Sequence, residues 1–153
     1  MASRRKSRIL AFQALYFWES SSSSRSRRVP LEELVCFSWL EEEKQKRLDG
    51  GTAAFSKALV AGVIENIDDI DKMLQDHLEN WDISRINRVD LAVLRMSIYS
   101  LMFQNDMHPS IVIDEAIGIC REFGADDSYK FINGILDSVR KTLLLKTQEP
   151  EKT

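Results

Sequence analysis

The sequence is poor in cysteine and histidine, which limits the chemistry that it can support. Its 153 residues include two cysteines, Cys36 and Cys120, and two histidines, His77 and His108. No Cys-x-x-Cys pair occurs, and neither histidine has a cysteine or a second histidine at a metal-ligand spacing. We therefore expect no disulfide framework, no metal and no cofactor. So little cysteine also fits a chain that works in the reducing cytoplasm.

Long apolar runs and catalytic motifs are absent as well. No stretch reaches the roughly 18 consecutive apolar residues of a membrane span, and the basic amino end lacks the apolar core of a secretory signal. There is no glycine-rich phosphate loop, no nucleophile elbow and no His-Glu-x-x-His motif. These absences argue against a membrane protein and against an enzyme.

Positive charge is scarce except at the amino end. Up to residue 28 the chain carries seven basic side chains against Glu19 alone, a net charge of +6. The other 125 residues carry 14 basic and 23 acidic side chains, a net charge of −9, so that the whole chain has −3. The seven basic residues are Arg4, Arg5, Lys6, Arg8, Arg25, Arg27 and Arg28. A basic end on an acidic body indicates a localised anion-binding face.

The apolar residues recur at a period near 3.6, and no segment alternates convincingly at a period of two. This pattern predicts an all-α fold of about seven helices, arranged as two small helical bundles packed together. We expect an amino-terminal subdomain over residues 1–67 with a basic first helix, a carboxy-terminal subdomain over 68–146, and a disordered tail over 147–153.

Serine, proline and glycine mark the breaks in the first subdomain. We expect a helix over 4–19, a flexible loop over 20–29, a helix over 30–47, a break at 49–51 and a helix capped by Thr52. The apolar stripe of the first helix consists of Ile9, Phe12 and Tyr16. That stripe leaves open the alternative that Tyr16 is a core residue.

The second subdomain begins where acidic residues interrupt the pattern, near residues 66–69. Asp82 or Ser84 is the expected cap of the next helix. That helix is apolar around most of its circumference, from Ile86 to Met102, which is typical of the centre of a bundle.

Two further helices complete the second subdomain. Pro109 can begin one of them and Gly124 can end it as a C-cap. Asp126 or Asp127 then caps the last helix. Gly134 lies inside that helix, where glycine is costly, so we expect another helix to approach closely there.

The basic amino end carries the clearest functional signal. Clustered arginine and lysine attract phosphates, and cations at the start of a helix oppose its dipole, so stability does not explain them. Tyr16 lies on the same predicted helix, where its ring could stack an unpaired base for about 1–3 kcal/mol. The alternative is a solubilising basic tail.

Several stretches, in order along the chain, resemble the NusB family. They are Arg4 to Arg8 with Ala11 to Tyr16, Leu59 to Val63, Asn80-Trp81 with Arg85-Ile86, Val89 to Arg95, Ile113 to Ala116, and Phe123 to Asp137. The resemblance covers most of the chain from Arg4 to about Val139. The serine–arginine loop over 20–29 departs from the family pattern, as do Asp114 and Gly118.

The resemblance implies a helical transcription antitermination factor without catalytic activity. It implies binding to single-stranded boxA RNA of nascent ribosomal RNA transcripts, together with the small-subunit ribosomal protein NusE, in the elongating RNA polymerase complex. The implied RNA-binding residues are Arg4, Arg5, Lys6, Arg8, Tyr16, Asp127, Lys130 and Phe131. The implied partner face lies around Trp81, Asp90 and Arg95, on the acidic body that suits a basic protein. A homodimer is a further possibility that the family implies.

One alternative function stays open at this point. A helical protein–protein interaction module with an incidental basic tail would bind a partner and would not bind RNA.

Overall fold

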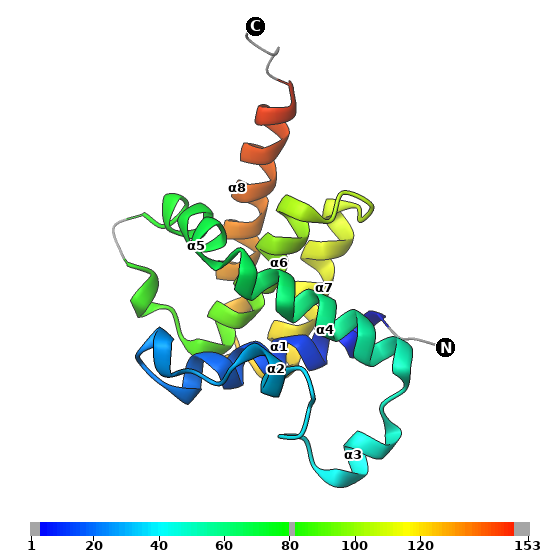
Figure 1. The fold of residues 1–153 in the computed structure, drawn as a ribbon. Coiled ribbons are helices and arrows are strands. Elements are labelled where there is room, and N and C mark those ends of the chain that lie inside the picture. The colour runs from blue at the N-terminus through cyan, green and yellow to red at the C-terminus, as the bar shows by residue number, and fades with distance from the viewer. Residues whose placement is uncertain (1–3, 80–81, 149–153) are drawn as a thin grey trace, which may run out of the picture. The chain divides into compact units, whose positions relative to one another are not determined.

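The computed structural model describes residues 4–79 and 82–148, in which every regular element is a helix (Figure 1). The elements are α1 (Arg4–Ser21), η1 (Arg25–Arg27), α2 (Leu31–Leu34), α3 (Glu42–Arg47), α4 (Gly50–Glu65), α5 (Ile67–Asp76), η2 (Ile83–Arg85), α6 (Arg88–Phe103), α7 (Pro109–Phe123) and α8 (Ser128–Gln148). The predicted all-α class is confirmed. Of the described residues, none forms a helix that is both long and apolar enough to cross a membrane.

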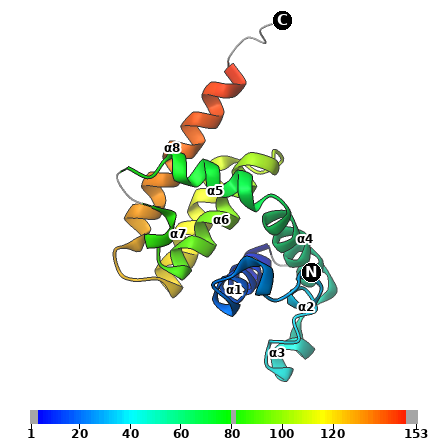
Figure 2. The same cartoon turned by 60° about the vertical axis from the view of Figure 1, so that its left-hand side comes forward.

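The chain divides into two compact units, over residues 1–66 and 67–153. In the first unit, α1 packs along α4. In the second unit, α6 packs against α5, α7 and α8 (Figure 2). The boundary falls where α4 ends at Glu65 and α5 begins at Ile67.

The buried side of α1 includes Phe12 of the predicted stripe but not Tyr16. Ala11, Ala14, Leu15 and Trp18 are all buried, whereas Tyr16 is 40% exposed. The alternative that Tyr16 is a core residue is therefore wrong. The buried side has the predicted 3.6-residue period but is rotated around the helix, so that it keeps Phe12 and leaves Tyr16 exposed; periodicity alone does not fix that rotation.

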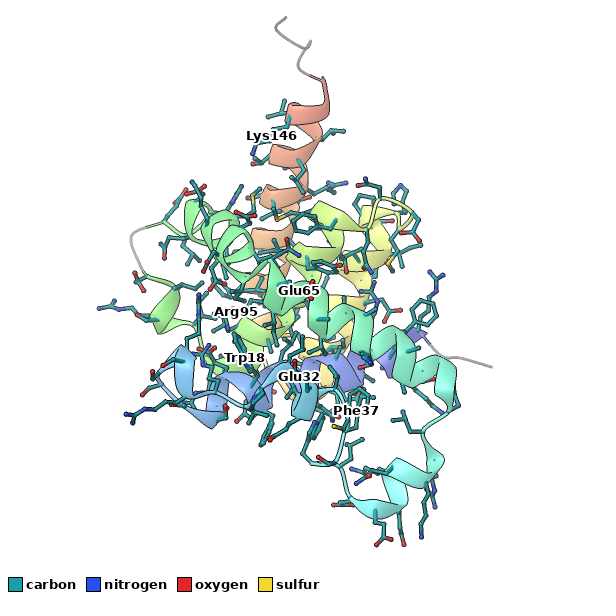
Figure 3. All side chains as sticks on the ribbon, in the orientation of Figure 1. Trp18, Glu32, Phe37, Glu65, Arg95 and Lys146 are labelled. Carbon is teal, nitrogen blue, oxygen red and sulfur yellow. The ribbon has the colours of Figure 1, made fainter. Side chains whose placement is uncertain are left out.

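The predicted helix over 30–47 is interrupted. α2 ends at Leu34 and α3 begins at Glu42, and between them Phe37 has a left-handed φ of 58° (Figure 3). Phe37 is buried, and the indole N–H of Trp39 donates to the carbonyl of Leu34 at 2.8 Å. Burial of the aromatic ring offsets the cost of this backbone conformation.

The start of α4 also differs from the prediction. Asp49, rather than Thr52, is the N-cap, because Asp49 Oδ1 accepts from the backbone N–H of Thr52 at 2.8 Å. The Thr52 hydroxyl donates to Asp49 Oδ2 at 2.8 Å. These two hydrogen bonds lower the pKa of Asp49, and the bond from the backbone N–H of Thr52 has the larger effect. Gly50 and Gly51, which were expected to separate two helices, form the first turn of α4.

The central position of α6 is confirmed, since every residue from Asp90 to Ile98 is buried. Its N-cap is Asn87, whose side-chain oxygen accepts from the N–H of Asp90 at 2.9 Å. The prediction of Asp82 or Ser84 was wrong for this helix. Asp82 instead caps the short helix η2, accepting from the N–H of Ser84 at 2.9 Å.

Polar bonds fix α5 to its neighbours. Arg95 of α6 donates from Nε and Nη2 to the two carboxylate oxygens of Asp71, each at 2.9 Å. The ring nitrogens of His77 lie 2.7 Å from the Met73 carbonyl oxygen and 2.8 Å from the Thr142 hydroxyl of α8. His77 therefore has a structural role between α5 and α8.

Candidate nucleic-acid interface

The amino end of α1 presents three exposed cations, Arg4, Arg5 and Lys6. The Arg4 guanidinium lies 5.4 Å from the centroid of the Phe55 ring on α4. Next to these cations, the buried Ser7 hydroxyl donates to the Thr52 carbonyl at 3.2 Å and fixes α1 against α4. The basic cluster is thus carried by a helix whose position within the first unit is set by packing.

Arg8 differs from the other three predicted cations because it is only 5% exposed. It lies on the side of α1 that also carries Leu15, close to the buried face. Sequence spacing did not reveal this difference. A direct phosphate contact by Arg8 stays a prediction, and its burial makes it the weakest of the four.

Aromatic side chains lie further along α1. Tyr16 is 40% exposed, and its Cα lies about 12 Å along the helix axis from that of Arg8, at 1.5 Å per residue. Phe17 is also exposed, and its ring stacks on that of Trp39 with centroids 5.9 Å apart and 17° between planes. The sequence analysis did not identify this pair.

The serine–arginine loop over 20–29 is held onto α1 by Arg28. The Arg28 guanidinium lies 4.5 Å from the Trp18 ring centroid, and its Nη1 is 2.9 Å from Glu19 Oε2. Arg28 Nε also donates to the Ser22 carbonyl at 3.0 Å. The predicted loop over 20–29 is only partly a loop, because α1 extends to Ser21 and Arg25–Arg27 form the short helix η1, whose arginines are exposed.

The remaining predicted RNA-binding residues lie where α7 leads into α8. Asp127 and Lys130 are exposed, with Lys130 Nζ 3.8 Å from Asp127 Oδ1. Phe131, in the first turn of α8, is half-buried. α7 ends here at its C-cap Gly124, whose N–H donates to the Cys120 carbonyl at 2.7 Å.

A cation–aromatic pair that sequence reasoning missed adjoins this turn. The Arg121 guanidinium lies 4.6 Å from the Tyr129 ring centroid, and Lys130 Nζ lies 6.0 Å from the same centroid. Arg121 is on α7 and Tyr129 on α8, so only the turn between the helices brings them together. No short-range sequence signal reports such a contact.

The structure thus gathers the predicted RNA-binding residues into two groups, one in each unit. Arg4, Arg5, Lys6, Arg8 and Tyr16 share α1, and Asp127, Lys130 and Phe131 share the start of α8. A single surface formed from both groups remains a prediction.

Two residues of the predicted partner face are buried. Asp90 and Arg95 are 4% and 5% exposed, and each is engaged within the second unit. The Asp90 carboxylate accepts from the Asn87 amide at 3.0 Å, and Arg95 binds Asp71. Trp81 lies outside the described residues. A partner contact through Asp90 or Arg95 stays a prediction, and their burial disfavours it.

Asp90 also faces the thiol of Cys120, with Cys120 Sγ 3.8 Å from Asp90 Oδ1. Burial, followed by the negative charge of Asp90, raises the pKa of Cys120 to about 11. The thiol is therefore neutral at physiological pH. Among the described residues, no group of three or more histidine, cysteine or acidic side chains is arranged to hold a metal ion.

Comparison with known proteins agrees with the fold and the order of these elements. A model of the NusB family matches residues 5–141. The transcription antitermination protein NusB of Treponema denticola is 50% identical over 137 residues, which cover 90% of this chain and 95% of that protein. The relative is named as an antitermination protein and not as an enzyme, in agreement with the sequence expectation.

Solved structures give the same assignment. NusB of T. maritima has a TM-score of 0.78 and 32% identity, covering 92% of this chain and 93% of that one. Antitermination factors NusB and NusE in complex with double-stranded RNA match with a TM-score of 0.69 and 23% identity, covering 91% and 96%, which shows the shared fold. On the family match and the identity to its relatives, this chain belongs to the NusB family.

Proposed function

We propose that this chain is a transcription antitermination factor that binds boxA RNA of nascent ribosomal RNA transcripts. It acts with the ribosomal protein NusE in the elongating RNA polymerase complex, in the cytoplasm. The observation that carries the proposal is the row of exposed cations at the start of α1, on the same helix as the exposed ring of Tyr16. Cations bind the phosphates of a single strand, and an exposed ring can stack one of its bases.

The relatives support this assignment. The Treponema denticola protein is named for transcription antitermination, and one solved neighbour holds NusB with NusE and double-stranded RNA. The residues beyond position 28 carry a net charge of −9, which favours a basic protein partner. Because Asp90 and Arg95 are buried, we propose that such a partner instead binds exposed acidic side chains among the residues beyond position 28.

A binding assay with labelled boxA RNA, with and without NusE, tests the proposal. The wild-type chain is expected to bind the single strand, and more tightly when NusE is present. Arg5→Ala is expected to weaken binding, because it removes an exposed cation. Lys72→Ala, which removes an exposed cation of α5, serves as the matched control and is expected to have no effect.

The outcomes separate the two candidate functions. Tight NusE binding without any effect of RNA would indicate a helical protein–protein module and would contradict the proposal. Sedimentation of the free chain tests whether it also forms the homodimer that we propose as a further possibility.

A further inference from the structure

A cavity of about 270 Å³ opens beside the basic start of α1, wholly within the first unit. Its walls come from α1, from the end of α3 and from the start of α4. Its aliphatic lining residues are Ile9, Leu10, Leu40 and Leu48. The walls are mostly aliphatic, and no aromatic ring is among them.

The polar groups of the cavity are of two kinds. Lys6, Lys44 and Arg47 give it three cations, against the single carboxylate of Asp49. The Gln13 amide offers a donor and an acceptor. A small anion alone would leave the aliphatic walls and the carboxylate unused, whereas an apolar ligand would leave the cations unused.

The walls are fixed by bonds within the unit. The Gln45 amide donates to the Leu40 carbonyl at 2.6 Å and so fixes the segment before α3 against that helix. Asp49 is held as the N-cap of α4 by Thr52, and the Ser7 hydroxyl links α1 to the Thr52 carbonyl. The cavity is therefore a formed feature of the unit, with its carboxylate in a set position.

The cavity is continuous with the proposed RNA face. Lys6, Ile9, Gln13 and Tyr16 follow one another at three- and four-residue spacings, so they share one side of α1. Lys6 belongs both to the exposed cation row and to the cavity lining. A strand that follows this side of α1 from the cations towards Tyr16 passes the mouth of the cavity.

We propose that this cavity takes one unstacked nucleobase of the bound RNA strand. The base lies between the aliphatic walls, the flanking phosphates bind Lys44 and Arg47, and Asp49 and Gln13 contact the base edge. A carboxylate accepts hydrogen bonds only, so Asp49 contacts a donor on the base edge, either an exocyclic amine or a ring N–H. The proposal rests on the proposed function, because it assumes that the chain binds single-stranded RNA.

The cations are tested first, by the salt dependence of boxA RNA binding. Lys44→Gln and Arg47→Gln are each expected to reduce the slope of log affinity against log salt by about 0.7, the contribution of one phosphate contact on a single strand. Lys46→Gln is the matched control, since Lys46 is an exposed cation of the same helix that pairs with Glu42 and does not line the cavity. It is expected to leave the slope unchanged.

The position of the base is tested with RNAs that carry 2-aminopurine at one position at a time. This adenine analogue is quenched by stacking, so one position is expected to brighten when its base enters the aliphatic cavity. Gln13→Glu keeps the size of the side chain but adds a second carboxylate beside Asp49. It is expected to abolish the brightening at that position while the rest of the strand still binds.

The results distinguish failure of this inference from failure of the proposed function. If the wild type binds RNA but Lys44→Gln and Arg47→Gln behave like Lys46→Gln, and no position brightens, the cavity is not a base site. If the wild type binds no RNA at all, the proposed function fails and the base site fails with it.

Discussion

Gly124 and Gly134 lie on either side of the start of α8 and differ in the space around them. A Cβ atom built on Gly124 would lie 2.7 Å from the Cys120 carbonyl oxygen and 3.1 Å from its sulfur. A Cβ atom on Gly134 would meet no atom within 4 Å. The expectation that another helix approaches Gly134 closely is therefore wrong for the described residues, whereas Gly124 is required by a close backbone contact.

The first prediction contrasts these two glycines. Gly134→Ala is expected to raise the free energy of unfolding by about 0.5–1 kcal/mol, because alanine costs less backbone entropy in a helix. Gly124→Ala is expected to lower it, since the carbonyl of Cys120 has to move. Urea denaturation measures both, and equal effects of the two changes would contradict the account.

The second prediction concerns the two thiols. Cys36 is exposed and Cys120 is buried with a pKa of about 11, so iodoacetamide near neutral pH is expected to label Cys36 and spare Cys120. Unfolding the chain should expose both thiols to the reagent. Mass spectrometry of the labelled peptides distinguishes these outcomes, and rapid native labelling of Cys120 would contradict its burial beside Asp90.

The raised pKa of Cys120 also affects stability at high pH. Above the ordinary value of 9.0 the unfolded chain loses the thiol proton, while the folded chain keeps it up to about pH 11. The folded state then binds more protons, so stability falls as pH rises through this window. Below pH 9 this contribution is fully present, and Cys120→Ser is expected to reduce the fall above it.

At the scale of the elements, α5 is joined to α6 by the pairing of Arg95 with Asp71. The Arg95 side chain is 6% exposed and that of Asp71 is 17% exposed. Arg95→Ala is expected to lower the free energy of unfolding by about 3 kcal/mol, because it leaves a largely buried carboxylate without its cation. Urea denaturation measures the change.

A matched control for this pair lies on α5, the helix that carries Asp71. Lys72 forms an exposed ion pair with Asp76 at 3.2 Å, and such pairs contribute little. Lys72→Ala should therefore leave the denaturation midpoint almost unchanged. If Arg95→Ala had as small an effect and instead weakened NusE binding, the predicted partner role of Arg95 would be favoured over its structural role.

The helices also show what sequence patterns can and cannot predict. The apolar circumference of α6 predicted its central place, and Pro109 predicted the start of α7. The interruption between α2 and α3 could not be predicted, since no glycine or proline lies between residues 35 and 41. It depends on the burial of Phe37, which is a property of the packed unit rather than of its local sequence.

The candidate site was predictable only in part from the sequence. The clustering of cations in the sequence identified Arg4, Arg5 and Lys6, which are exposed. It could not show that Arg8 is buried, because a shift of two or three positions around a helix changes the side that a residue occupies. Contacts across turns, such as Arg121 with Tyr129, also required the three-dimensional structure.

At the scale of the whole molecule, the proposed RNA binding rests on the separation of charge along the chain. A net charge of +6 up to residue 28 and −9 beyond it is expected to steer RNA towards the amino end. A chain of the same composition with dispersed charges would lack this property. The strand would then bind weakly, if at all, whatever the helical fold.

The salt dependence of boxA RNA binding to a variant with Arg4→Gln and Arg5→Gln tests this claim most directly. The account predicts a slope of log affinity against log salt that is shallower than wild type by about 1.4, or about 0.7 per lost phosphate contact. The control with Lys72→Gln and Lys141→Gln removes the same charge from exposed residues of the second unit and should keep the wild-type slope. Equal slopes for the two double variants would contradict the account.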